Sequence, residues 1–330
     1  MAHTYDVAAM GNALLDVLAP ADDEFLLQHN IAKGVMTLID EFRALQLYEA
    51  FGETQEVAGG SAANTAAGVA SLGAKGLYVG KVKRDRLGQS FSASMKNLGV
   101  HYATRMARDG AATGCCLIAV TPDGQRSMST FLGASGALAP ADLDENEIAA
   151  SAVLYVEGYL WDSPEPKAAI TRAMEVAHRA GRKVALTLSD PFCVGRYRQE
   201  FRDLFETSLD IIFANEDEAM ALFEVETFDE VLQAVRGWHG IAALTRSEKG
   251  CVIAKGSEVH VIDAARVERV VDTTGAGDQF AAGFLVGLSR GRTLAECGRL
   301  GALSAAEVIS HYGARPEVSL QALANRAGLL

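Results

Sequence analysis

The stretch VVDTTGAGDQF, Val270–Phe280, is the most informative part of the chain. Two aspartates, Asp272 and Asp278, flank two threonines and the run Gly275-Ala276-Gly277. The preceding ERVVDTT has a β-like pattern, and GDQFAAGFLVGLSRG has the pattern of an amphipathic helix that Gly291 closes. We therefore predict a strand-to-helix junction, at which small residues let the backbone turn sharply and expose consecutive N–H groups.

The start of this helix is a predicted anion site. The first N–H groups of a helix lack partners within the helix, and the helix dipole adds partial positive charge there. Gly275, Ala276 and Gly277 are thus expected to bind an anion, commonly a phosphate. An acid in the first turn, such as Asp278, also serves as a cap or dipole partner. Because a carboxylate repels phosphate, we interpret Asp278 as a base that accepts the proton of an attacking hydroxyl.

Length and composition limit the class of protein. The chain has 330 residues, 49% of them hydrophobic and 22% charged, which suffices for one large domain with an appended subdomain. A formal net charge of -12 argues against nucleic acid or an anionic membrane as the main partner. Five scattered cysteines without a CxxC pair are typical of reduced thiols. With no signal-peptide pattern and no apolar run of roughly 18 residues, a cytoplasmic location is expected.

Short apolar runs alternate with amphipathic stretches along the chain. Continuous apolar runs favour strands that are covered on both faces, and they occupy residues 5–11, 76–82, 152–158, 183–189, 210–215 and 241–247. Helical patterns lie between them, for example at 61–73, 166–181 and 228–240. This order predicts an α/β fold with a mostly parallel central sheet, helices on both faces, and ligands beyond the carboxyl ends of the strands.

Two regions interrupt this alternation. Residues 12–55 and 100–135 are richer in short strand-like runs, and TPDG at 121–124 is a turn between two of them. We predict one α/β domain over residues 1–330, with a small β-rich lid built discontinuously from about 12–55 and 100–135. The alternative is that both regions form ordinary edge hairpins of the central sheet.

The segment DTTGAGDQFAAGF, 272–284, resembles the C-terminal signature of the ribokinase-like (PfkB) family of carbohydrate and nucleoside kinases. AGGSAANTA, 58–66, resembles the N-terminal signature of that family. The resemblance implies a ribokinase-like fold and an ATP-dependent phosphotransferase, with Asp278 as base and Gly275, Ala276 and Gly277 as anion hole. Other glycine motifs fit poorly: Phe280 stands where a dinucleotide fingerprint needs glycine, and no Walker A loop is present.

Five residues are candidates for binding the acceptor. Gly59 and Gly60 let the backbone approach a ligand closely, and Asn64 offers both a donor and an acceptor to hydroxyls. Asp16 suits a vicinal diol, because a carboxylate accepts two O–H bonds. The resemblance assigns Asp16, Gly60 and Asn64 to sugar hydroxyls, and Asn12 is the best polar candidate for a base or ribose contact. The alternatives are a turn acid for Asp16 and a cap or surface amide for Asn64.

Two further segments point to the phosphate donor. In ANEDEA, Asn215 and Glu218 share one face of an expected helix, and the resemblance places them near Mg²⁺ and the phosphates, with Glu218 acting through water. A solvated acidic first turn is the alternative. LTRSEKGCVI resembles the family's nucleotide-binding loop, with Thr245, Arg246 and Gly250 in it. Arg246 would contact phosphate oxygens in forked geometry, unless it is simply a surface arginine.

The resemblance also implies an optional K⁺ ion beside ATP and Mg²⁺. SAAEVISHYGARPE, 304–317, resembles the segment that flanks the adenine and a monovalent-cation site. Carbonyl oxygens would supply most of the ligands, together with Asp272 and Thr274. One departure from the family pattern is that Lys83 and Arg84 replace a glycine and an acid.

Several segments favour the adenosine-kinase branch of the family, among them GNALLDV, TGCCLIAVTPDGQRS, LTLSDPF and GARPE. The predicted reaction is therefore phosphorylation of the adenosine 5′-hydroxyl to AMP, as in purine salvage. Phe131, Leu132 and Phe192 are candidate apolar walls for a purine, although each also suits a core position. A sugar kinase with a ribose- or fructose-like acceptor is the alternative, and a non-catalytic sugar- or nucleotide-binding regulator is a remote one. The expected partner is a small nucleoside or sugar, bound by a monomer or homodimer.

Overall fold

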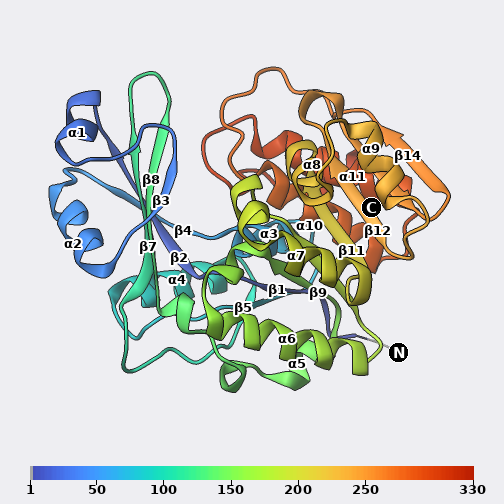
Figure 1. Ribbon diagram of the computed structural model, residues 1–330, viewed down its shortest axis with the longest axis horizontal. Helices are drawn as coiled ribbons and strands as arrows, with labels where there is room; N and C mark the ends of the chain where they lie inside the picture. The colour runs from blue at the N-terminus through green and yellow to red at the C-terminus, as the bar shows by residue number, and fades with distance from the viewer. Residues whose placement is uncertain (1–2) are drawn as a thin grey trace.

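The computed structural model describes residues 3–330 and is drawn in Figure 1. A nine-stranded sheet has the order β14-β13-β12-β11-β10-β9-β1-β5-β6. Neighbours from β6 to β12 run parallel, whereas β13 and β14 pair antiparallel at one edge. The strands are β1 (Tyr5–Met10), β5 (Gly76–Val79), β6 (His101–Tyr102), β9 (Ser151–Glu157), β10 (Lys183–Thr187), β11 (Ile211–Asn215), β12 (Ile241–Thr245), β13 (Cys251–Lys255) and β14 (Glu258–Ile262).

Helices cover both faces of this sheet, because successive strand side chains point to opposite sides. In β1, Val7 and Ala9 are in one core cluster and Ala8 and Met10 are in the other. The first cluster is covered by α3 (Ser61–Ser71), α4 (Arg86–Asn97), α10 (Ala276–Ser289), α11 (Leu294–Val308) and α12 (Leu320–Arg326). The second is covered by α5 (Glu145–Ala149), α6 (Pro164–Arg179), α7 (Pro191–Thr207), α8 (Glu216–Phe223) and α9 (Phe228–Val235). The predicted α/β class is confirmed.

A second, five-stranded sheet has the order β3-β8-β7-β2-β4 and stands beside the main body at the left of Figure 1. Its strands are β2 (Leu14–Pro20), β3 (Met36–Leu38), β4 (Gln55–Gly59), β7 (Thr113–Val120) and β8 (Arg126–Gly133). Two helices, α1 (Asp23–Gln28) and α2 (Glu41–Ala50), lie on its outer side. The sheet is drawn from two separate parts of the chain, and its action as a lid stays a prediction.

The two faces of the smaller sheet have different surroundings. Val17 of β2 and Leu117 of β7 belong to a small core cluster with Leu47 of α2, and Phe131 packs against that cluster. Asp16 and Leu132 occupy alternate strand positions and therefore lie on the opposite face. The candidate wall residue Phe131 thus points away from the face that carries Asp16.

The remaining elements between residues 3 and 330 are four 3-10 helices: η1 (Ala134–Ala137), η2 (Pro140–Asp142), η3 (Gly158–Asp162) and η4 (Ser247–Lys249). The predicted strand over ERVVDTT is wrong, since residues 263–275 form neither helix nor strand. Val270 is 53% exposed, and β14 already occupies the edge of the main sheet, so this segment has no neighbouring strand to pair with. Val271 is held instead by a hydrogen bond from its N–H to the carbonyl of Ile309 at 2.8 Å.

The cysteines, Cys115, Cys116, Cys193, Cys251 and Cys297, are all free and buried, in agreement with small apolar core positions. Burial raises the pKa of the Cys115 thiol to about 11. Within residues 3–330, no helix combines the length and apolarity that a membrane crossing requires.

Candidate active site

Asp278 lies in the first turn of α10, where two side chains of α3 bind it. Ser61 donates from Oγ to Asp278 Oδ1 at 2.6 Å, and Asn64 donates from Nδ2 to Asp278 Oδ2 at 3.0 Å. Burial raises the pKa of Asp278 to about 6, against the opposing effect of these two hydrogen bonds and of the positive charge on Arg315. The acid of the C-terminal signature and the polar residues of the N-terminal signature therefore form one cluster.

The turn before α10 has free N–H groups, although not at every predicted position. Gly275 is the N-cap with φ 80°, and a Cβ there would come within 2.7 Å of Ala314. The Ala276 N–H donates to the carbonyl of Thr273 at 3.2 Å and is therefore already used. Within residues 3–330, no acceptor is found for the N–H groups of Gly275, Gly277 and Asp278. These three groups at a helix N-terminus fit a phosphate, and the anion-hole role stays a prediction.

The predicted acceptor residues come from the turn between β1 and β2, the start of β2, the end of β4 and the first turn of α3. A Cβ on Gly59 would collide with the Asp16 carboxylate, and one on Gly60, whose φ is 95°, would collide with the carbonyl of Asn12. Glycine is therefore required at both places. Burial raises the pKa of Asp16 to about 6, although the positive charges on Arg126 and Arg315 act in the opposite direction.

Asn64 has partners for both ends of its amide. Nδ2 donates to Asp278, and Oδ1 accepts from Arg315 Nε at 3.2 Å. The predicted contact between Asn64 and a sugar hydroxyl would have to share or replace one of these bonds, and it stays a prediction.

Glu157, at the end of β9, is a site residue that sequence reasoning missed. Its carboxylate is 1% exposed and accepts the N–H of Asn12 at 2.7 Å and the N–H of Ala62 at 2.8 Å. A Cβ on Gly11 would collide with it. Burial raises the pKa of Glu157 to about 7 despite both hydrogen bonds. Glu157 thus ties together the two acceptor segments, and its one visible signal is an acid at the end of an apolar strand.

Arg126 of β8 was also missed, and it changes the environment of Asp272. Nη1 of Arg126 lies 2.6 Å from Asp272 Oδ2 and 3.0 Å from Thr274 Oγ1. Asp272 also accepts the N–H groups of Thr274 at 3.0 Å and Gly313 at 3.1 Å. Burial would raise the pKa of Asp272, but the hydrogen bonds from Thr274 and Gly313 and the charge of Arg126 outweigh it and lower the pKa.

This geometry does not fit the implied K⁺ ion. Both oxygens of the Asp272 carboxylate have partners, and one of them is a cation of the protein itself. The assignment of Asp272 and Thr274 as cation ligands therefore lacks structural support and stays a prediction, and no step below depends on K⁺.

Asn215 and Glu218 form a reciprocal cap at the start of α8. Asn215 Nδ2 donates to Glu218 Oε1 at 2.7 Å, the Asn215 N–H donates to Oε2 at 2.9 Å, and the Glu218 N–H donates to Asn215 Oδ1 at 2.8 Å. Burial raises the pKa of Glu218 to about 7. Within residues 3–330, no group of three or more histidine, cysteine or acid side chains could hold a metal. Mg²⁺ keeps several waters and needs few protein ligands, and a water-mediated role for Glu218 stays a prediction.

The predicted nucleotide loop lines a cavity of about 200 Å³ together with Asn215. Thr245 ends β12, Arg246 follows it, and Gly250 has φ 79° at the turn into β13. The Arg246 guanidinium forks onto the Glu216 carboxylate at 3.2 and 3.1 Å and lies 4.0 Å from the centre of the Phe228 ring. A phosphate would therefore have to compete with Glu216 for Arg246, and this contact stays a prediction.

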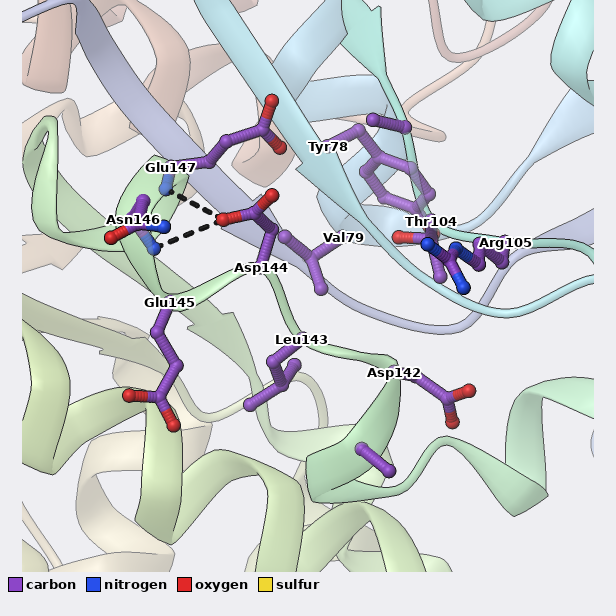
Figure 2. A pocket seen from close by; sticks show the side chains of 12 residues that line it. Tyr78, Val79, Thr104, Arg105, Asp142, Leu143, Asp144, Glu145, Asn146 and Glu147 are labelled. Atoms are coloured by element: carbon purple, nitrogen blue, oxygen red, sulfur yellow. Dashed lines mark hydrogen bonds between the residues drawn. The ribbon is translucent and has the colours of Figure 1, made fainter.

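A larger cavity, of about 430 Å³, lies elsewhere and contains none of the predicted site residues (Figure 2). Four acids line it with Arg105, but they already have partners: Asp144 caps α5 by accepting the N–H groups of Asn146 and Glu147. The remaining three acids form ion pairs: Asp142 with Lys81, Glu145 with Arg172, and Glu147 with His101. We assign this cavity no part in the reaction.

Lys83 and Arg84, where the chain departs from the family pattern, lie just before α4, and the Lys83 N–H donates to Thr113 at the start of β7. Lys83 Nζ donates to the carbonyl of Gly110 at 2.6 Å, and Asp85 caps α4 while accepting the N–H of Thr113 at 2.8 Å.

Among the candidate apolar walls for a purine, Leu132 is half-buried and Phe192 is 77% exposed at the start of α7.

Several known proteins are similar to this chain over nearly its whole length. A solved structure of a probable sugar kinase from Rhizobium etli CFN 42 is similar with a TM-score of 0.93 and 47% identity, over 99% of this chain and 100% of that one. The structure of an adenosine kinase from Sinorhizobium meliloti has a TM-score of 0.91 and 49% identity, over 98% and 99% of the two chains. An adenosine kinase from Saccharomyces cerevisiae is 28% identical over 335 residues, covering 94% of this chain and 96% of the relative. The family model for the pfkB family of carbohydrate kinases matches residues 39–320. The chain therefore belongs to the pfkB family.

Proposed function

We propose that this pfkB-family kinase transfers the γ-phosphate of ATP to the 5′-hydroxyl of adenosine and releases AMP. The observation that carries the proposal is the position of Asp278, a partly buried carboxylate between Ser61 and Asn64 of α3 and the free N–H groups that begin α10. A base beside an anion site is the arrangement that phosphoryl transfer to an alcohol requires.

Each element of the cluster has a role in the proposed step. Asp278 accepts the proton of the attacking hydroxyl, and a pKa raised by burial to about 6 makes it a better proton acceptor while it stays largely ionised at neutral pH. The N–H groups of Gly275 and Gly277 would stabilise negative charge on the transferred group. When bound, ATP with Mg²⁺ would supply the phosphoryl group and neutralise part of its charge.

Adenosine is favoured as acceptor by two observations. The chain resembles adenosine kinases over nearly its whole length. Asp16 offers a carboxylate to a ribose diol, and Leu132 shares its face of the smaller sheet, which provides apolar surface for a purine.

A sugar kinase is the second candidate, favoured by the likeness to the probable sugar kinase from Rhizobium etli CFN 42. Asp16 and Asp278 would serve the diol and hydroxymethyl group of a free sugar equally well. The acceptor therefore has to be decided by measurement rather than by these two carboxylates.

The test is a steady-state comparison of adenosine, cytidine, ribose and fructose as acceptors, with ATP and MgCl₂ in each assay. We expect the highest kcat/KM for adenosine. A higher kcat/KM for ribose or fructose would overturn the adenosine assignment, and no turnover with any of the four would argue for a binding protein without kinase activity.

A further inference from the structure

We propose that Arg315 is a positioning residue for phosphoryl transfer, which fixes the amide of Asn64 so that this side chain donates to Asp278. The inference rests on the proposed function, because it concerns how the base of that reaction is held. Arg315 lies in the segment between α11 and α12, far along the chain from Asn64.

Two consecutive hydrogen bonds carry the inference. Arg315 Nε donates to Asn64 Oδ1 at 3.2 Å, and Asn64 Nδ2 donates to Asp278 Oδ2 at 3.0 Å. A guanidinium has no acceptor and a carboxylate has no donor, so the amide between them fits in one orientation. Turning the amide over would set its NH₂ group against the guanidinium and its oxygen against the carboxylate. Arg315 therefore dictates which end of Asn64 faces Asp278.

The guanidinium is itself held in place by neighbouring elements. Nη1 donates to Ser94 Oγ at 3.1 Å, and Nη2 lies 3.8 Å from the sulfur of Met95, both on α4. Next to it in the chain, the carbonyl of Ala314 accepts from Gln279 Nε2 at 3.0 Å, and the same nitrogen donates to the carbonyl of Asn64 at 2.9 Å. Gln279 thus keeps the Arg315 segment against α3.

The positive charge of Arg315 acts on two carboxylates of the candidate active site. Within residues 3–330, it forms no direct ion pair, and Asp16 and Asp278 are the carboxylates on which its charge acts. A largely buried cation is costly unless negative charge faces it. Here the two acids supply that charge, and each is in turn stabilised in its ionised form by Arg315.

Three acids and a phenol also interact electrostatically with Asp278: Asp16 from β2, Tyr155 and Glu157 from β9, and Glu218 from α8. Arg315 is the cation whose charge opposes the burial of Asp278. Removing this charge should therefore raise the pKa of Asp278, and the acidic limb of the rate profile should move to higher pH.

The test is the pH dependence of kcat for Arg315→Gln and Arg315→Lys, with the best acceptor of the panel at saturation so that the limb reports the bound state. In Arg315→Gln we expect a lower kcat and an acidic limb that moves up by roughly one pH unit. Arg315→Lys keeps the charge, so its limb should stay near that of the parent enzyme even if kcat falls. Arg105→Gln, the same change at an exposed arginine of the 430 Å³ cavity, is the matched control.

An unmoved limb in Arg315→Gln would overturn the inference, as would equal losses in the Gln and Lys variants with no movement of either limb. Asn64→Ala, which removes the link while keeping Arg315, should also move the limb upward, and it decides the matter if Arg315→Gln does not fold. In a double-mutant cycle the Arg315→Gln and Asn64→Ala effects on kcat should be strongly non-additive, and additive effects would contradict transmission through Asn64. An inactive parent enzyme would instead overturn the proposed function.

Discussion

Arg126 of β8 and Asp272 form an ion pair at 2.6 Å that joins the smaller sheet to the loop before α10. The two side chains are 21% and 9% exposed, so the pair is largely shielded from water. Each partner comes from a different part of the fold, one from the smaller sheet and the other from the turn that precedes the candidate anion site. The ion pair therefore links that turn to a residue 146 positions earlier in the chain.

Breaking this pair should loosen the turn. In Arg126→Met, Asp272 loses its cation and Thr274 loses one donor, so we expect faster amide hydrogen exchange across residues 270–276 than in the parent protein. Arg108→Met, at an exposed position, is the control. Unchanged exchange in this segment would mean that the backbone contacts of Asp272 hold the turn without Arg126.

Replacing the proposed base should remove transfer without removing binding. In Asp278→Asn, the side chain still fills its place between Ser61 and Asn64 but accepts no proton, and kcat should fall by about 10²–10⁴-fold. The Kd for ATP, measured by calorimetry, should change little. Asp263→Asn, an exposed acid of the loop before α10, is the control. Turnover of Asp278→Asn at the parent rate would show that another group takes the proton.

Asp16 should act on acceptor binding. In Asp16→Asn the diol loses a charged acceptor, and a hydrogen bond to a charged group contributes about 1.5–3 kcal/mol, so the KM of the acceptor should rise by about 10- to 100-fold. The KM of ATP should stay within about twofold of the parent value under the same reasoning. An acceptor KM equal to that of the parent enzyme would remove Asp16 from the acceptor site.

Glu157 should make stability depend on pH. Its ordinary pKa of 4.5 is raised to about 7 in the folded protein, so the folded state keeps this proton to higher pH than the unfolded chain does. Over this window Glu157 should contribute a loss of roughly 3 kcal/mol of unfolding free energy as the pH rises, and Glu157→Gln should lack this contribution.

Urea unfolding of the parent protein and of Glu157→Gln at pH values from 4.5 to 7.5 measures this difference. At the acidic end Glu157→Gln should be the less stable protein by about 1–3 kcal/mol, because its NH₂ group faces a backbone N–H. Glu165→Gln, the same change at an exposed position in α6, is the control. A difference between parent and Glu157→Gln that is constant across this range would refute the linkage.

Local pattern was sufficient for much of the fold. The runs at 152–158, 210–215 and 241–247 are continuously apolar and predict buried strands, and β9, β11 and β12 occupy most of them. ERVVDTT has similar local propensity, yet it forms no strand, because a strand needs a neighbour and β14 already closes that edge. Strand formation here depended on tertiary context that the segment itself does not contain.

Some residues of the candidate active site could also be predicted from the sequence, whereas others could be found only in the folded chain. Asp278, Asp16 and the glycines were expected because their spacing and residue types carry the chemistry. Glu157, Arg126 and Arg315 were missed, since their importance lies in partners that are brought near only by folding: two backbone N–H groups, Asp272, and Asn64. No spacing rule in one sequence identifies such pairs, and each looks like an isolated charged residue until the chain is folded.

The most direct measurement is ³¹P NMR of a reaction that contains the protein, ATP, MgCl₂ and adenosine, with 5′-deoxyadenosine in a parallel sample. We predict that ATP is converted to ADP with matching growth of the AMP phosphate resonance, and that neither change occurs with 5′-deoxyadenosine or with the Asp278→Asn protein. AMP formation by Asp278→Asn at the parent rate, or no AMP from adenosine while ribose or fructose is phosphorylated, would contradict the proposed reaction.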